Sequence, residues 1–121
     1  MVKFSRFLQI FCGCHCRSDR SFFYKGKQFP VCARCTGTLI GYLLGILWLV
    51  FFVHWNIGIC LLVCMPLIVD GIGQQLGKWE STNIRRFVTG LLLGMAIINA
   101  LVNYHYFLVW EARKVLEFFQ N

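Results

Sequence analysis

Residues 36–55 read TGTLIGYLLGILWLVFFVHW, a run without a single Asp, Glu, Lys or Arg. A helix needs about 20 predominantly apolar residues to cross the hydrocarbon core of a bilayer. Further uncharged runs follow at 57–69 and 87–110. Only 14% of the 121 residues are charged, against about 25% in a typical soluble domain. The sequence therefore predicts an all-α integral membrane protein with transmembrane helices at 36–55, 57–76 and 87–110.

The segments that flank these helices complete a single predicted membrane domain over residues 1–121. Residues 1–11 carry apolar side chains at positions i, i+3, i+4 and i+7, a pattern typical of a short helix lying in the membrane interface. Residues 12–35 are polar and cysteine-rich and are expected to form a loop. Residues 111–121 show a second amphipathic pattern, which predicts another short interfacial helix at the C-terminus.

Glycines repeat every fourth residue in the first and third predicted membrane helices. Gly37, Gly41 and Gly45 lie in the first, and Gly90 and Gly94 lie in the third. Small residues at this spacing let another helix approach closely. We therefore expect glycine-lined helix contacts, either inside the bundle or with a partner chain.

The basic residues indicate the orientation in the membrane. Seven Lys or Arg residues precede residue 36 and three more lie between the second and third helices, whereas only two follow residue 110. Because Lys and Arg concentrate on the cytoplasmic side, we expect a multi-pass protein of the cell (cytoplasmic) membrane with its N-terminus in the cytoplasm. Topology and anionic lipid head groups account for the net charge of +7, so no nucleic-acid partner is indicated.

The cysteines before the first membrane helix predict a metal site. The cytosol keeps thiols reduced, which favours metal binding or catalysis over a disulfide framework. Two thiolates of a Cys-x-x-Cys pair can occupy two corners of a tetrahedral zinc site. We predict zinc or another divalent metal, and no organic cofactor. Four protein ligands would make the ion structural, whereas three would leave a position for an activated water. The predicted ligands are Cys14, His15, Cys32 and Cys35.

Two other chemistries remain open for these thiols. Cys32 and Cys35 could alternate between dithiol and disulfide, as in membrane thiol-disulfide oxidoreductases of the vitamin K epoxide reductase type. The export-side placement of those enzymes conflicts with the orientation expected here. Cys12, Cys14 and Cys16 have the softness and spacing to hold Cu(I).

A second group of polar residues surrounds Asp70, the only acidic residue inside a predicted span. A carboxylate at membrane depth marks a functional site, or pairs with an arginine that locks the bundle. Gln74 lies one turn further on the same helix face. The loop then runs through Glu80 to the start of the third helix, where free N–H groups and arginines suit an anion.

We therefore predict a polar pocket at the cytoplasmic face for an anionic lipid or isoprenoid-phosphate head group. Asp70 and Glu80 are the candidate acid/base residues of a metal-dependent hydrolase or transferase acting on that phosphate. The alternative is a non-enzymatic, zinc-stabilised membrane scaffold. Three helices rarely enclose a site alone, so a homo-oligomer or a partner membrane protein is expected. The predicted ligand-binding residues are Arg20, Ser21, Arg34, Gln74, Ser81, Thr82, Asn83 and Arg85.

The order of these motifs resembles that of the family named domain of unknown function 2085, a group of small predicted prokaryotic membrane proteins. The resemblance implies that the cysteine site and the polar pocket belong together. Trp79 departs from it, because members often carry a basic residue there, and Cys12 and Cys16 lie outside it, which weakens the Cu(I) hypothesis. The motifs that carry the resemblance are Cys14-His15, Arg20-Ser21-Phe22, Gly26, Gln28, Pro30, Cys32-Ala33-Arg34-Cys35-Thr36-Gly37, Asp70-Gly71, Gln74, Glu80-Ser81-Thr82-Asn83, Arg85 and Thr89-Gly90.

Overall fold

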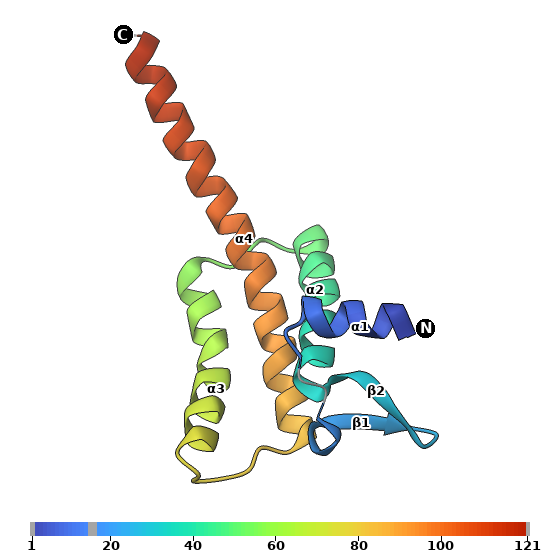
Figure 1. Cartoon of the computed structure of the whole chain (residues 1–121). Coiled ribbons are helices and arrows are strands. Elements are labelled where there is room, and N and C mark those ends of the chain that lie inside the picture. The colour runs from blue at the N-terminus through green and yellow to red at the C-terminus, as the bar shows by residue number, and fades with distance from the viewer. Residues whose placement is uncertain (1, 15–16, 121) are drawn as a thin grey trace.

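The computed structural model describes residues 2–14 and 17–120 of the chain. Three helices of the described part are long and apolar enough to cross a membrane, and they lie side by side (Figure 1). A short helix, a single 3-10 turn and a two-stranded hairpin precede them. In chain order the elements are α1 (Val2–Phe11), η1 (Ser18–Arg20), β1 (Ser21–Tyr24), β2 (Lys27–Cys32), α2 (Ala33–Phe51), α3 (Ile57–Gln75) and α4 (Asn83–Gln120).

The tail does not form a separate helix as predicted for 111–121. Instead, α4 continues as one helix to Gln120, and its C-terminal part projects beyond α2 and α3 (Figure 1). The physical reason is local: the segment after Trp110 has no Gly or Pro, and its Glu-Ala-Arg-Lys run consists of strong helix formers. The ion pair between Lys114 and Glu111, at 3.7 Å, adds one further helical contact.

Glycines bring α2 and α4 into backbone contact, as their spacing predicts. A Cβ atom on Gly41 would collide with the carbonyl oxygen of Leu91 and lie 3.0 Å from the Cα atom of Gly94. A Cβ atom on Gly90 would collide with the carbonyl oxygen of Arg34. The glycine stripe of α2 is therefore covered inside this chain rather than by a partner.

The region predicted as a loop contains a β-hairpin, so the fold is mostly helical and the all-α prediction is wrong in this region. Strands β1 and β2 pair antiparallel. The two residues between them, Lys25 and Gly26, have φ angles of 49° and 75°. A two-residue turn with positive φ at both positions matches the twist of a hairpin. The aromatic run of β1 favours a strand, and the Lys-Gly pair that follows was the available turn signal.

At the opposite end of the bundle, α4 holds the connection between α2 and α3. The side-chain oxygen of Asn99, a fully buried residue, accepts a hydrogen bond from the backbone N–H of Trp55 at 3.0 Å. The Asn103 amide donates to the carbonyl oxygen of Trp55. Buried backbone groups outside regular secondary structure need hydrogen-bond partners from elsewhere in the protein. These two asparagines supply such partners to an irregular connection.

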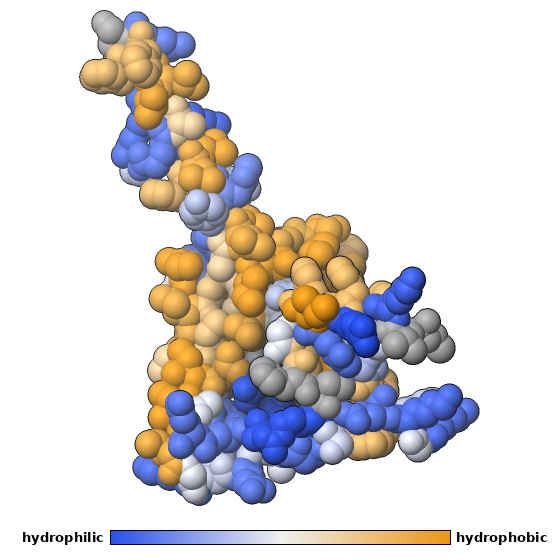
Figure 2. Space-filling view, viewed as in Figure 1, coloured by the Kyte–Doolittle hydropathy of each residue, from blue (hydrophilic) through white to orange (hydrophobic). Residues whose placement is uncertain are grey.

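The hydropathy of the surface changes along the axis of the helix bundle. Figure 2 shows hydrophilic surface gathered at the end that carries the hairpin and the α3–α4 loop, with hydrophobic surface over the spans. We call this the hairpin end. Helix α1 runs across the direction of the spans (Figure 1) and contacts β2. Its exposed large apolar side chains are Phe4, Phe7, Ile10 and Phe11.

Candidate metal centre and adjoining polar pocket

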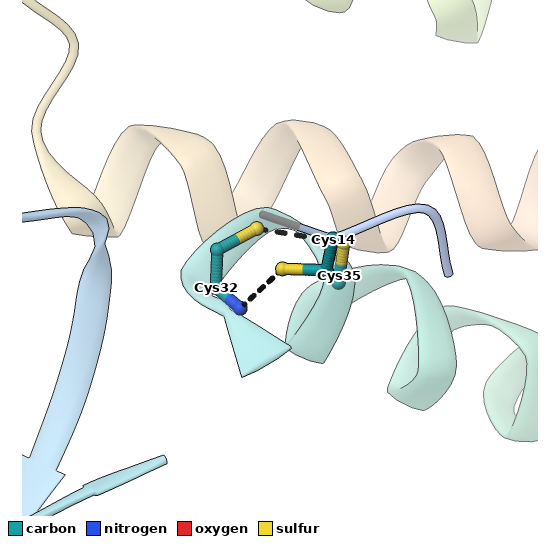
Figure 3. A group of neighbouring side chains, drawn as sticks. All are labelled: Cys14, Cys32 and Cys35. Carbon is teal, nitrogen blue, oxygen red and sulfur yellow. Dashed lines mark hydrogen bonds between the residues drawn. The ribbon is translucent and has the colours of Figure 1, made fainter. Parts of the chain in front are cut away.

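Three cysteine sulfurs meet where the N-terminal segment reaches the start of α2 (Figure 3). The Sγ atoms of Cys14, Cys32 and Cys35 all lie within 4.8 Å of one another. Those of Cys32 and Cys35 are 3.4 Å apart. Zinc–sulfur bonds of about 2.3 Å in a tetrahedral site place two thiolates about 3.8 Å apart. The three sulfurs are therefore positioned to hold a metal ion.

The local backbone places hydrogen-bond donors around these sulfurs. Cys32 is the N-cap of α2 and Cys35 lies in its first turn, where free N–H groups and the helix dipole stabilise negative charge. The backbone N–H of Cys32 donates a hydrogen bond to Cys14 Sγ at 3.1 Å (Figure 3). The hydrogen bond between the thiol groups of Cys32 and Cys35 lowers the pKa of Cys32 to about 5. Cys32 is therefore the thiol of this pair that ionises more readily.

The other predicted or possible ligands of the cysteine-rich segment are not part of this three-sulfur cluster in the described residues. His15, the fourth predicted ligand, and Cys16 lie outside the described residues. Cys12 is not part of the three-sulfur cluster, although its carbonyl oxygen is 3.9 Å from Cys35 Sγ. Burial raises the pKa of the Cys12 thiol, which keeps it protonated.

Asp70 is 2% exposed and is surrounded by donors from three elements and a loop. Arg34 Nη2 lies 3.1 Å from one carboxylate oxygen, and Arg85 Nη2 lies 3.5 Å from the other. The Gln74 amide donates at 2.8 Å and the Trp79 indole N–H at 3.4 Å. One carboxylate thus joins α2, α3, α4 and the loop before α4. The arginine pairing expected of an intramembrane acid is present.

Arg34 connects the thiol cluster to this carboxylate. It stands between Cys32 and Cys35 in the first turn of α2, and its guanidinium reaches Asp70 on α3. A shift of the first turn of α2 would therefore move both the thiols and the Asp70 ion pair. The two groups of residues that the sequence singled out are mechanically linked.

A polar cavity of about 580 Å³ opens beside Asp70 at the hairpin end. It lies between η1, the end of α3 and the start of α4. Four of the residues predicted for the pocket are not among those that line it: Ser21, Arg34, Asp70 and Arg85. Ser21 is buried instead, and its hydroxyl donates to the Arg17 carbonyl oxygen at 2.9 Å. The cavity is lined by Asp19, Arg20, Gln74, Gly77, Trp79, Glu80, Ser81, Thr82, Asn83 and Arg86.

Four residues that line the cavity were missed from the sequence: Asp19, Gly77, Trp79 and Arg86. Trp79 fits because Gly73 has no side chain: a Cβ atom there would collide with the indole ring. Arg86 is 9% exposed, whereas the Arg85 side chain is 52% exposed. The buried Thr89 follows Arg86 by three residues. Extending this helical spacing back from the glycine face of α4 would have identified Arg86 as the inward-facing arginine.

Comparison with known proteins places the chain among membrane proteins. Residues 14–100 match a family model described as "Predicted membrane protein (DUF2085)". An uncharacterized protein of Methanothermobacter thermautotrophicus is 38% identical over 88 residues, which cover 69% of this chain and 79% of the relative. An uncharacterized protein of Methanocaldococcus jannaschii is 32% identical over 107 residues, which cover 84% of this chain and 69% of the relative. No solved structure matches the chain. This chain therefore belongs to the DUF2085 family of predicted membrane proteins, the family that its motifs resemble.

Proposed function

We propose that the thiol cluster holds zinc or a similar divalent ion, which clamps the N-terminal segment onto the start of α2. The observation that carries the proposal is the convergence of the Cys14, Cys32 and Cys35 sulfurs within 4.8 Å. His15, adjacent to Cys14, is the proposed fourth ligand, and with it the ion would be structural. With water in that position instead, the ion could activate a nucleophile.

Elemental analysis of the purified protein tests this proposal. About one zinc per chain is expected from a single site, and Cys32→Ser should lose it because a serine hydroxyl replaces a thiolate ligand. Cys12→Ser and Cys64→Ser are matched controls that keep the three-sulfur cluster, so each should retain the ion. A metal-free wild-type protein, or equal loss of zinc in Cys12→Ser, would contradict the proposal.

The short Cys32–Cys35 distance and the lowered pKa of Cys32 also favour a second candidate, thiol-disulfide exchange. In that reaction the two thiols would form a disulfide and pass two electrons and two protons to a quinone or to a substrate disulfide. Alkylation after acid quenching of cells separates the two functions. A metal clamp keeps both thiols reduced, whereas a redox site yields a measurable oxidised fraction.

We further propose that the polar cavity accepts an anionic lipid or isoprenoid-phosphate head group. Its position at the hairpin end, the arginines in its lining and the start of α4 support this proposal. In the enzymatic form, a hydrolase or transferase, Glu80 is the better placed acid or base, because it lines the cavity while both Asp70 oxygens are engaged by donors. In the non-enzymatic form the chain is a scaffold, as a homo-oligomer or with a partner membrane protein. Turnover of a lipid phosphate that Glu80→Gln abolishes would select the enzyme.

The proposed orientation places the hairpin end and the thiol cluster in the cytoplasm, in the cell membrane, with α1 in the interface. The distribution of basic residues supports it, as do the exposed apolar side chains of α1. A C-terminal fusion to alkaline phosphatase, which needs disulfides to fold, should be active because three spans put the C-terminus outside. An inactive phosphatase together with a fluorescent C-terminal green fluorescent protein would reverse the orientation.

A further inference from the structure

Arg86 is a buried cation that forms no ion pair with a carboxylate of the described residues. Its residue is 9% exposed, and within the described part of the chain no carboxylate lies within 4.0 Å of its nitrogens. Its hydrogen bonds go to the side-chain oxygens of Asn83 and Gln74, each at 3.5 Å. Both partners are neutral amides at the long limit of hydrogen-bond distance.

This arrangement leaves the guanidinium undersatisfied. Removing a charged group from water is unfavourable unless a counter-ion and well-formed hydrogen bonds replace the water. The neighbouring arginines differ from Arg86 because Arg34 and Arg85 each have a carboxylate counter-ion, Asp70. A guanidinium has five N–H donors, and two long contacts use few of them. Arg86 therefore has donors available for a ligand in the cavity that it lines.

The rest of the lining completes an anion site. Arg20, on η1, faces the same cavity and is only loosely paired with Asp19 at 3.8 Å. Ser81 and Thr82 add hydroxyl groups next to the first turn of α4. Asp19 and Glu80 line the cavity too, but both are exposed, so water and salt weaken their repulsion of an anion.

We propose that Arg86 is the charge that binds the phosphate group of a phosphate-bearing ligand in this cavity, with Arg20 as the second cation. The inference rests on the head-group pocket of the proposed function, and it names the residue and the chemical class. Arginine suits phosphate because its planar fork can donate two parallel hydrogen bonds. The same chemistry serves a lipid head group and a soluble phosphate, and the experiment distinguishes these sources.

The test uses the purified full chain in detergent with two probes. Calorimetry measures the affinity for inorganic phosphate, and mass spectrometry measures retained phosphatidylglycerol after incubation with mixed micelles. Arg86→Gln should weaken binding of the relevant probe about tenfold or more, because a charge-assisted bidentate contact is lost. Arg113→Gln, at the far end of α4, is the matched control and should change neither measurement. Arg85→Gln, which removes the adjacent arginine, should weaken binding less than about threefold.

Arg20→Gln keeps the proposal testable if Arg86→Gln does not fold, because the Arg20 side chain is 46% exposed. It should weaken the same probe several-fold while circular dichroism stays unchanged. Saturable, Arg86-dependent binding of inorganic phosphate supports a soluble ligand, and Arg86-dependent retention of phosphatidylglycerol alone supports a lipid.

Three results would overturn the assignment. Binding of a probe that is equally strong in wild type and Arg86→Gln, with no Arg86 dependence for the other probe, would reject Arg86 while leaving the head-group pocket in place. Failure of wild type to bind either probe would reject both the assignment and the pocket. Equal losses in the Arg85 and Arg86 variants would show a general effect of charge. Zinc content measured on the same samples reports the metal clamp separately, since neither arginine is a proposed ligand.

Discussion

Gly41→Ala is expected to lower the free energy of unfolding by about 3 kcal/mol, the upper part of the usual range for overpacking. The new methyl group would collide with the Leu91 carbonyl oxygen, and Gly94 Cα would lie only 3.0 Å away. Both obstacles are backbone atoms of α4, so no side chain can rotate aside and the helices must separate. Thermal unfolding in detergent, followed by circular dichroism, measures the loss. Gly41→Leu should prevent the α2–α4 contact altogether.

Gly71→Ala provides the matched control for this prediction. It makes the same chemical change in the interior of α3, where a Cβ atom would meet nothing within 4 Å. Alanine is a better helix former than glycine by about 1 kcal/mol, so this variant should be unchanged or slightly more stable. Similar losses for Gly41→Ala and Gly71→Ala would show that the α2–α4 backbone contact does not stabilise the fold.

Asp70→Leu is expected to cost about 3 kcal/mol, near the lower end of the range for breaking a buried ion pair. The substitution leaves the guanidinium groups of Arg34 and Arg85 without a counter-ion. Their side chains are 33% and 52% exposed, so water compensates in part. Asp70→Asn should cost less, because an amide oxygen still accepts hydrogen bonds. The change in unfolding free energy in detergent measures both effects.

Glu111→Gln is the control for loss of a carboxylate. Glu111 pairs with Lys114 at 3.7 Å on the projecting part of α4, where both side chains are about half exposed, so the expected change is below about 0.5 kcal/mol. The double variant Arg34→Gln/Asp70→Asn should lose less than the sum of its single variants, because both remove the same ion pair. Strict additivity would mean that Arg34 and Asp70 do not stabilise each other.

The membrane helices were predictable because their signal is local. An uncharged run of sufficient length needs a helix wherever it lies, since the bilayer leaves no other way to satisfy its backbone. The Cys-x-x-Cys spacing was equally informative, because two thiols one turn apart at a helix start converge whatever surrounds them. The hairpin was missed because a Lys-Gly turn is a weaker signal than Asn-Gly, and because the cysteines directed the interpretation of that segment toward a loop.

The pocket shows where sequence reasoning reaches its limit. Of the residues predicted to form the pocket, Arg20, Gln74 and residues 80–83 line the cavity. Composition, however, does not show which of the adjacent residues Arg85 and Arg86 pairs with Asp70 and which lines the cavity. The rotation of α4 against α2, which the glycine contacts set, places Arg85 toward Asp70 and Arg86 in the wall of the cavity. The position of the Trp79 indole could not be predicted from the sequence either. The indole packs against Gly73, which lies in α3, whereas Trp79 lies in the loop after that helix.

By itself, the sequence determined that this chain has three helices long and apolar enough to cross a membrane, carries clustered thiols before the first and belongs to the DUF2085 family of predicted membrane proteins. These properties depend on length, polarity and short spacings, which are written along the chain. The tertiary structure decided which charges are neutralised and which are not. Burial and pairing depend on groups far apart in sequence, and their arrangement follows from how closely glycine lets two helices approach.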